Sequence, residues 1–172
     1  MNNSEKNKNI LELKAPFLTG EYMPMEYTCE GGGQSPQLSW NSVKNAQSYV
    51  LIVDDPDAPR EFLKPDEDAF VHWILFNILP AITFLPAHVS LEELARSYIL
   101  IGTNSSGQQR YMGPCPPHGP AHKYRFRLYA LDQKLVLPSG ATKAQVVQAM
   151  SGHILEQTEL VGIYRRHSVG HA

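Results

Sequence analysis

Residues that could bind a small polar ligand are concentrated between positions 113 and 124. Four prolines between Gly113 and Pro120 fix the backbone φ angle and remove N–H donors, which makes this stretch a stiff loop. A strand is expected at 122–131, where His122 and Tyr124 lie two residues apart and therefore on one face. The loop would bring an imidazole and a phenol to one side of a sheet. A plain surface turn that leads into a strand fits the same pattern.

A second set of polar side chains follows another expected strand, the continuous apolar and β-branched run at 48–54. Three carboxylates lie in the turn at 54–59, and because Asp and Pro are common turn residues this turn is either solvated or the rim of a pocket. His72 belongs to a further strand expected at 70–77. It would share a face with Phe70, Ile74 and Phe76. A histidine on such an apolar face is more often a packed core residue than a ligand.

The remaining patterns indicate a predominantly β domain with minor helical decoration. Short strands are expected at 10–15, 38–40 and 98–101. A helix should begin after Thr142, because its hydroxyl and the side chain of Gln145 fit a capping box. At 155–164 the sequence fits the end of a helix followed by a strand, and it does not decide the assignment.

Length and composition describe an ordinary soluble globular protein. The 172 residues suit one domain, expected at 10–165 between a flexible N-terminal tail at 1–9 and a C-terminal tail at 166–172. A hydrophobic content of 42% and a net charge of −2 argue against a protein that coats nucleic acid. No apolar run approaches the ~20 residues that span a bilayer, so stable membrane insertion is not expected.

The N-terminus favours a cytoplasmic location, and that location sets the expected state of the cysteines. Residues 1–9 are polar and lack the apolar segment of a secretory signal. In the cytoplasm Cys29 and Cys115 should be free thiols, and neither forms a C-x-x-C pair that would indicate a zinc or redox site.

Several motifs together resemble the phosphatidylethanolamine-binding protein (PEBP) family, in particular its bacterial and archaeal branch, often described as Raf-kinase-inhibitor-like. These motifs are Asp-Pro-Asp-Ala-Pro at 55–59, His-Trp at 72–73, and Gly-Pro-x-Pro-Pro followed by His-x-Tyr at 113–124. Other similar stretches lie at 35–40, 126–132 and 152–162. The resemblance implies a β-sandwich with a large central sheet, a smaller second sheet and a few peripheral helices.

The resemblance also implies a small anion-binding cavity that accepts phosphate, acetate or a phosphoethanolamine head group. Carried over motif by motif, its residues would be Asp55, Asp57, His72, Pro116, Pro117, His122 and Tyr124. Two features depart from the family pattern: the segment 60–69 is longer than the usual link, and Met112 stands where glycine is expected. Both bear on the size of the pocket.

The residue types support such a cavity independently of the resemblance. Histidine and tyrosine supply N–H and O–H donors for an anion, and a neighbouring aspartate would orient an imidazole and favour its protonated form. No pair of arginines accompanies them, so bare phosphate should bind weakly. Neither a cofactor nor a metal is needed, and no catalytic residue is assigned.

Three other functions fit parts of the pattern. Cys115 with His122 and an aspartate would suit a thiol hydrolase, and a buried Asp–His pair would suit acid–base catalysis, but no Gly-x-Ser-x-Gly nucleophile motif is present. Two histidines and two aspartates would suit zinc. Eukaryotic relatives regulate kinases, so a protein partner such as a kinase is an expectation by analogy, and a homodimer is compatible with the sequence.

Two geometric predictions follow from the single-pocket interpretation. A carboxylate of Asp55 or Asp57 should lie within hydrogen-bonding distance of His72 or His122. The peptide bond between Ala58 and Pro59 is expected to be cis, because the chain must reverse where the buried strand meets the pocket rim.

Overall fold

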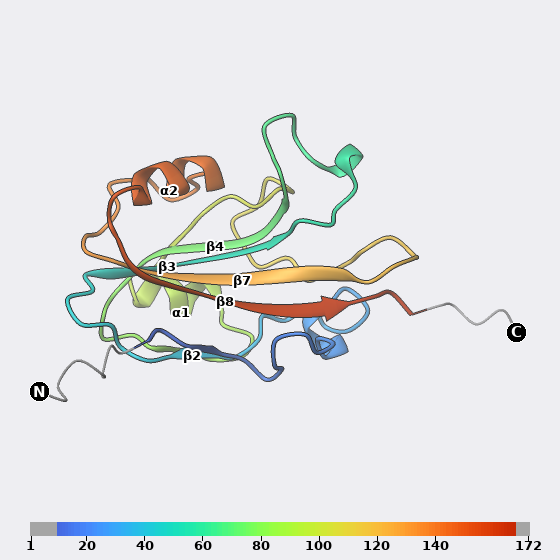
Figure 1. The fold of residues 1–172 in the computed structure, drawn as a ribbon, viewed down its shortest axis with the longest axis horizontal. Helices are drawn as coiled ribbons and strands as arrows, with labels where there is room; N and C mark the ends of the chain where they lie inside the picture. The colour runs from blue at the N-terminus through green and yellow to red at the C-terminus, as the bar shows by residue number, and fades with distance from the viewer. Residues whose placement is uncertain (1–9, 168–172) are drawn as a thin grey trace, which may run out of the picture.

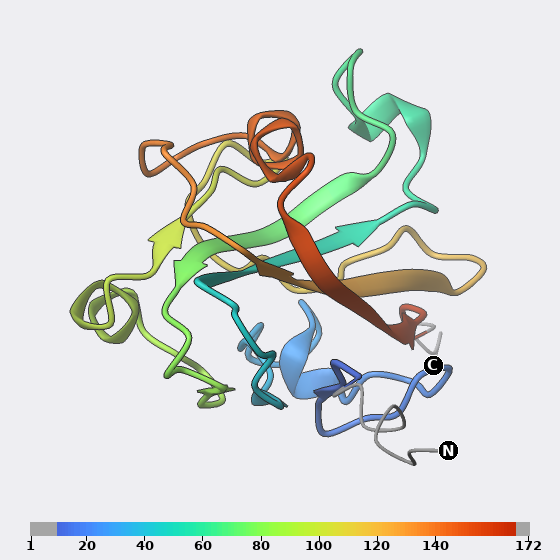
Figure 2. The ribbon, with the colours of Figure 1, turned by 60° about the vertical axis from the view of Figure 1, so that its left-hand side comes forward.

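The computed structural model describes residues 10–167, which form two antiparallel sheets. The five-stranded sheet has the order β6-β4-β3-β7-β8 and the three-stranded sheet the order β1-β2-β5. The large sheet lies between the small sheet on one side and helix α2 on the other (Figures 1 and 2). The expected mainly β sandwich is therefore confirmed.

Four strands of the large sheet are long, whereas β6 and the strands of the small sheet are short. The large sheet contains β3 (Ser48–Asp55), β4 (Phe70–Ile78), β6 (Leu100–Ile101), β7 (His122–Leu131) and β8 (Ile154–Tyr164). The small sheet contains β1 (Leu13–Lys14), β2 (Leu38–Trp40) and β5 (Phe84–Leu85). The helices are α1 (Leu91–Arg96) and α2 (Lys143–Met150), with single 3₁₀ turns η1 (Met25–Tyr27) and η2 (Arg60–Phe62).

Local sequence signals account for α2 and for β8. The capping box is confirmed, because Thr142 Oγ1 accepts a hydrogen bond from the Gln145 N–H and Gln145 Oε1 accepts one from the Thr142 N–H. The segment left open between helix and strand is β8, which pairs along almost the whole of β7.

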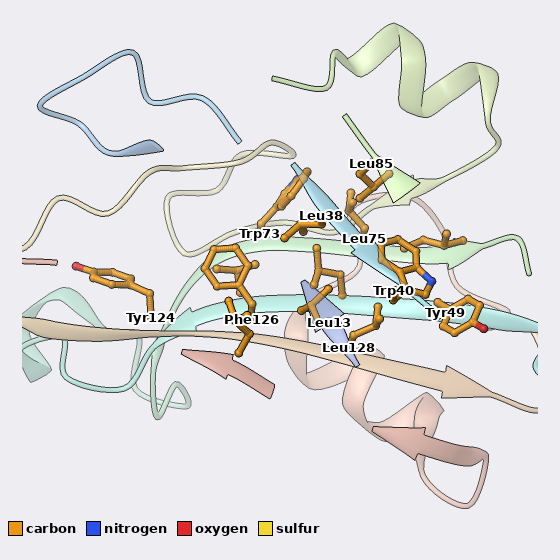
Figure 3. Packing of buried hydrophobic residues seen from close by; sticks show 14 of the residues in the cluster. Leu13, Leu38, Trp40, Tyr49, Trp73, Leu75, Leu85, Tyr124, Phe126 and Leu128 are labelled. Carbon is orange, nitrogen blue, oxygen red and sulfur yellow. The ribbon is translucent and has the colours of Figure 1, made fainter. Parts of the chain in front are cut away.

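Strand β7 separates two environments as its alternation predicts. Tyr124, Phe126 and Leu128 belong to the apolar cluster between the two sheets (Figure 3). Arg125 and Arg127 lie on the opposite face, where both bind the fully buried carboxylate of Asp54. A second apolar cluster on that face packs against α2.

Strand β4 does not alternate as expected, and the predicted face of His72 is wrong in part. Val53 of β3 pairs with Trp73, but the next residue, Asp54, pairs with Val71, so His72 is an extra residue in a β-bulge. The bulge turns His72 and Trp73 to the same side of the sheet, whereas Ile74 lies in the cluster beneath α2.

The chain reverses after β3 without a cis peptide. Peptide bonds of the described residues are all trans, so the cis prediction for Ala58–Pro59 is wrong. The Asp57 N–H donates to Asp55 Oδ1 over 2.8 Å, and this side-chain turn begins the reversal. Pro59 then caps η2 with φ −56° and ψ 140°, a conformation open to an ordinary trans proline.

Candidate functional site

A cavity of about 680 Å³ opens where β3 ends, β7 begins and β8 ends. Its volume lies within the roughly 300–1,000 Å³ of pockets that bind small molecules. The polar side chains on its wall are Asp55, His72, Ser106, His118, His122, Tyr124 and Arg166. Asp55, His72, His122 and Tyr124 were predicted from the sequence, and the prolines of the stiff loop, Pro116 and Pro117, also line the cavity.

Asp55 and His122 form the buried polar pair of the cavity. His122 Nδ1 lies 2.7 Å from Asp55 Oδ2, which confirms that a carboxylate lies within hydrogen-bonding distance of a histidine. The side chains are only 11% and 5% exposed. Because Asp55 Oδ1 already accepts the Asp57 N–H, both carboxylate oxygens have a partner and the imidazole ring is fixed in orientation.

The backbone just before the proline-rich loop at 113–120 fixes the orientation of His72. Its Nδ1 lies 2.6 Å from the carbonyl oxygen of Met112. A carbonyl oxygen can only accept, so Nδ1 carries the hydrogen and Nε2 is the free nitrogen. Burial lowers the pKa of His72 below its usual value, which keeps the ring neutral near pH 7.

Tyr124 supplies an unpaired donor between the two imidazoles. Its ring centroid lies 5.3 Å from that of His72, edge to face, and 6.4 Å from that of His122, stacked. The hydroxyl is buried without a hydrogen-bond partner among the described residues. Figure 3 shows it directed away from the other labelled core side chains. Burial, with the nearby charges of Asp55 and Asp57, raises the pKa of Tyr124, so the hydroxyl keeps its proton.

Asp57 lies beside the cavity and supports it from outside. It is absent from the lining, and its Oδ2 accepts the backbone N–H of Lys123 over 2.8 Å. This contact holds the start of β7, directly after His122. The structure thus places Asp57 as a support of His122 and brings the other six predicted residues together around the cavity.

Both departures from the family pattern add apolar surface to the wall. Phe62 enters from η2, in the segment 60–69, and the side chain of Met112 lines the cavity while its carbonyl binds His72. Phe70 lies next to them, with its ring centroid 5.1 Å from that of His72. The pocket therefore combines a polar floor with an apolar rim.

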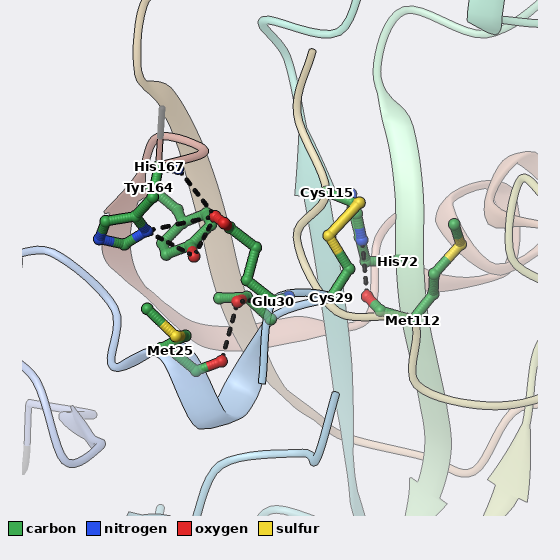
Figure 4. The surroundings of a disulfide bond; sticks show 9 residues. Met25, Cys29, Glu30, His72, Met112, Cys115, Tyr164 and His167 are labelled. Atoms are coloured by element: carbon green, nitrogen blue, oxygen red, sulfur yellow. Dashed lines mark hydrogen bonds and ion pairs between the residues drawn. A yellow bond between two sulfur atoms is a disulfide. The ribbon is translucent and has the colours of Figure 1, made fainter. Parts of the chain in front are cut away.

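A disulfide joins Cys29 to Cys115, and the expectation of two free thiols is wrong (Figure 4). The cysteines are 86 residues apart in sequence, but the loop after η1 packs against the pocket loop and brings their Cα atoms to 5.3 Å. The Cys29 N–H donates to the Pro114 carbonyl, and the Tyr111 hydroxyl donates to the carbonyl of Tyr27. Cys115 lines the cavity, so the disulfide anchors one of its walls.

Arg166 is the site residue that the sequence interpretation missed, because 166–172 was assigned to a tail. His122 pairs with Tyr164 across the sheet, so the residues that follow β8 emerge beside the pocket. Arg166 lines the cavity, and its Nε is buried without a partner among the described residues. The expected tail at 1–9 and the end of the second one, 168–172, lie outside the described residues.

Residues 10–167 also bear on metal sites and membrane spans. No group of three or more His, Cys, Asp or Glu side chains is arranged to hold a metal ion in this part of the chain. Among the same residues no helix is long and apolar enough to cross a membrane.

Fold and cavity together define a β-sandwich protein with a ligand-sized pocket at one end of its large sheet. The family model described as phosphatidylethanolamine-binding protein matches residues 14–165. A UPF0098 protein of Methanothermobacter thermautotrophicus is 46% identical over 145 residues, which cover 84% of this chain and 91% of the relative. The chain therefore belongs to the phosphatidylethanolamine-binding protein family.

Solved structures agree with this membership. A PEBP homologue of Chlamydia trachomatis superimposes with a TM-score of 0.83 and 36% identity, over 92% of this chain and 99% of the other. Escherichia coli YbcL, described as a member of the mammalian PEBP family, gives a TM-score of 0.80 and 26% identity, over 91% and 99% of the two chains.

Proposed function

We propose that the pocket binds a small anionic group, such as phosphate, acetate or the phosphorylated head group of phosphoethanolamine. The observation that carries this proposal is the buried, unpaired hydroxyl of Tyr124 between His72 and His122. A buried donor without an acceptor costs about 1–3 kcal/mol. An anionic oxygen in the cavity would supply that acceptor.

The two histidines would play different roles toward the anion. Each uses Nδ1 within the protein, so Nε2 is the nitrogen that remains for a ligand. When His122 is protonated its Nε2–H donates, and Asp55 balances the added charge. His72 stays neutral, so its Nε2 accepts a hydrogen bond from a protonated oxygen or an ammonium group of the ligand.

We propose binding without turnover. In the thiol-hydrolase alternative Cys115 would be the nucleophile, but its sulfur is bonded to Cys29. The Asp55–His122 pair is suited to holding a proton, and no hydroxyl or thiol nucleophile stands in hydrogen-bonding contact with it in the described part of the chain. Regulation of a protein partner such as a kinase, a homodimer and a cytoplasmic location all stay predictions from the sequence.

Isothermal titration calorimetry with phosphoethanolamine tests the proposal. His122→Ala should weaken binding roughly ten- to hundredfold, the worth of a hydrogen bond to a charged group. His153→Ala is the matched control, because His153 pairs with Asp132 beyond the far end of β7. Equal affinity in all three proteins would refute the site. Release of phosphate from a phosphoester by the wild type, and not by His122→Ala, would make the protein an enzyme.

A further inference from the structure

Arg166 brings a fixed positive charge to a cavity that otherwise contains groups of variable charge. Its Nε is buried and has no acceptor among the described residues, and no ion pair there involves its guanidinium. Asp55 is the one carboxylate among the cavity-lining residues, and both its oxygens are already engaged with His122 and Asp57. A buried N–H without an acceptor is unfavourable, so Nε calls for a partner beyond the described residues, such as a ligand in the cavity.

The carboxylate of Glu30 holds the chain on both sides of Arg166, through the side chain of Tyr164 and the backbone of His167. Glu30 Oε1 accepts the Tyr164 hydroxyl over 2.6 Å and the His167 N–H over 3.0 Å (Figure 4). These hydrogen bonds, with the one from Tyr164 the largest cause, lower the pKa of Glu30 to about 2, so it remains an ionised acceptor at neutral pH. Glu30 follows Cys29 directly, and the segment 29–30 therefore fixes two walls of the cavity, the Cys115 loop and Arg166.

Resting on the function proposed above, we propose that Arg166 is a specificity-determining residue that selects phosphate monoesters over phosphodiesters and simple carboxylates. A guanidinium offers paired N–H groups that fit two oxygens of a phosphate. A monoester carries about −1.5 to −2 charges at pH 7, whereas a diester or a carboxylate carries a single negative charge. His72 is neutral and His122 lies against the carboxylate of Asp55, so the charge of Arg166 is left to meet the additional charge of the monoester.

The chemistry distinguishes two sources of the same head group. In a membrane lipid the phosphoethanolamine phosphate is a diester, and in the free metabolite it is a monoester. Selection by Arg166 therefore favours a free phosphorylated small molecule over a lipid head group.

The test is calorimetry at pH 7.5 with phosphoethanolamine, glycerophosphoethanolamine and acetate as the monoester, diester and carboxylate. Wild type should bind the monoester at least roughly tenfold more tightly than the other two. Arg166→Gln should lose roughly ten- to hundredfold in monoester affinity and most of this preference. Arg165→Gln is the matched control, because Arg165 is exposed and absent from the cavity lining.

Each of the other outcomes contradicts the role of Arg166, the proposed function or the inferred ligand class. An unchanged monoester preference in Arg166→Gln, or an equal loss in Arg165→Gln, overturns the role of Arg166. If His122→Ala still abolishes binding in that case, the pocket remains the anion-binding site although Arg166 does not set its specificity. A wild-type protein that binds none of the three ligands overturns both proposals. Preferred binding of the diester refutes the inferred ligand class and favours the lipid source.

Glu30 is a positioning residue for Arg166 and has its own test. Glu30→Ala should lower the ratio of monoester to diester affinity, and the double variant Glu30→Ala/Arg166→Gln should have the same ratio as Arg166→Gln. A purely structural role would weaken both ligands equally and leave the ratio unchanged, which would contradict the positioning role.

Discussion

Removing the Cys29–Cys115 disulfide should lower the free energy of unfolding by several kcal/mol and weaken ligand binding at the pocket it anchors. The perturbation is reduction with dithiothreitol or the double substitution Cys29→Ser/Cys115→Ser. Both should leave the sheets intact, because the bond joins two loops and neither cysteine belongs to a helix or strand. The disulfide is also the feature on which the sequence interpretation was wrong.

The separation of the cysteines sets the expected magnitude. They are 86 residues apart, and a cross-link over that distance lowers the entropy of the unfolded chain by an amount worth about 4.6 kcal/mol at 25 °C in the chain-entropy model. Native disulfides typically contribute about 2–5 kcal/mol. For a domain of this size each kcal/mol changes the thermal midpoint by about 2–4 °C, so a decrease of roughly 5–15 °C is expected.

Urea unfolding followed by tryptophan fluorescence measures this effect. Thiol titration of the denatured protein should find no free thiol before reduction and two afterwards, which establishes the redox state. The reduced protein and the double variant should share one lowered urea midpoint, and dithiothreitol should have no further effect on the variant. Two free thiols in the protein as isolated, or identical midpoints before and after complete reduction, would refute the reasoning.

Two further predictions concern buried charge. Burial lowers the pKa of His72, so the unfolded chain binds more protons than the folded one as pH falls below about 6.5, and stability should decrease by up to about 1.4 kcal/mol per pH unit there. Urea midpoints between pH 7.5 and 5 check this, and a slope unchanged in His72→Gln would contradict it. Asp54→Asn should lower the free energy of unfolding by about 3–5 kcal/mol. The reason is that Arg125, Arg127 and Lys143 would lose the buried carboxylate that each binds at 2.8 Å. If urea unfolding shows that the free energy of unfolding decreases by less than about 1 kcal/mol, these cations are solvated instead.

Features set by neighbouring residues were the ones that sequence could predict. The alternation of β7 placed His122 and Tyr124 on one face because this end of the strand pairs with β8 without a break in register. Thr142 and Gln145 marked the start of α2 because a capping box depends on residues three positions apart.

Features that depend on distant pairing were missed. The bulge at His72 arises from the register between β3 and β4, which no alternation within β4 reveals. The bond between Cys29 and Cys115 and the position of Arg166 depend on which loops meet at the end of the sheet. The pairing of a strand at 154–164 with β7 would place Arg166 beside the pocket, but this inference requires that the order of the strands is already known.

A crystal structure of the protein with phosphoethanolamine bound tests the central claim most directly. The account predicts that the phosphate lies in the cavity, with an oxygen about 2.5–3.0 Å from the Tyr124 hydroxyl and another within hydrogen-bonding distance of His122 Nε2. A ligand bound elsewhere on the molecule, while these two groups bind only water, would contradict it.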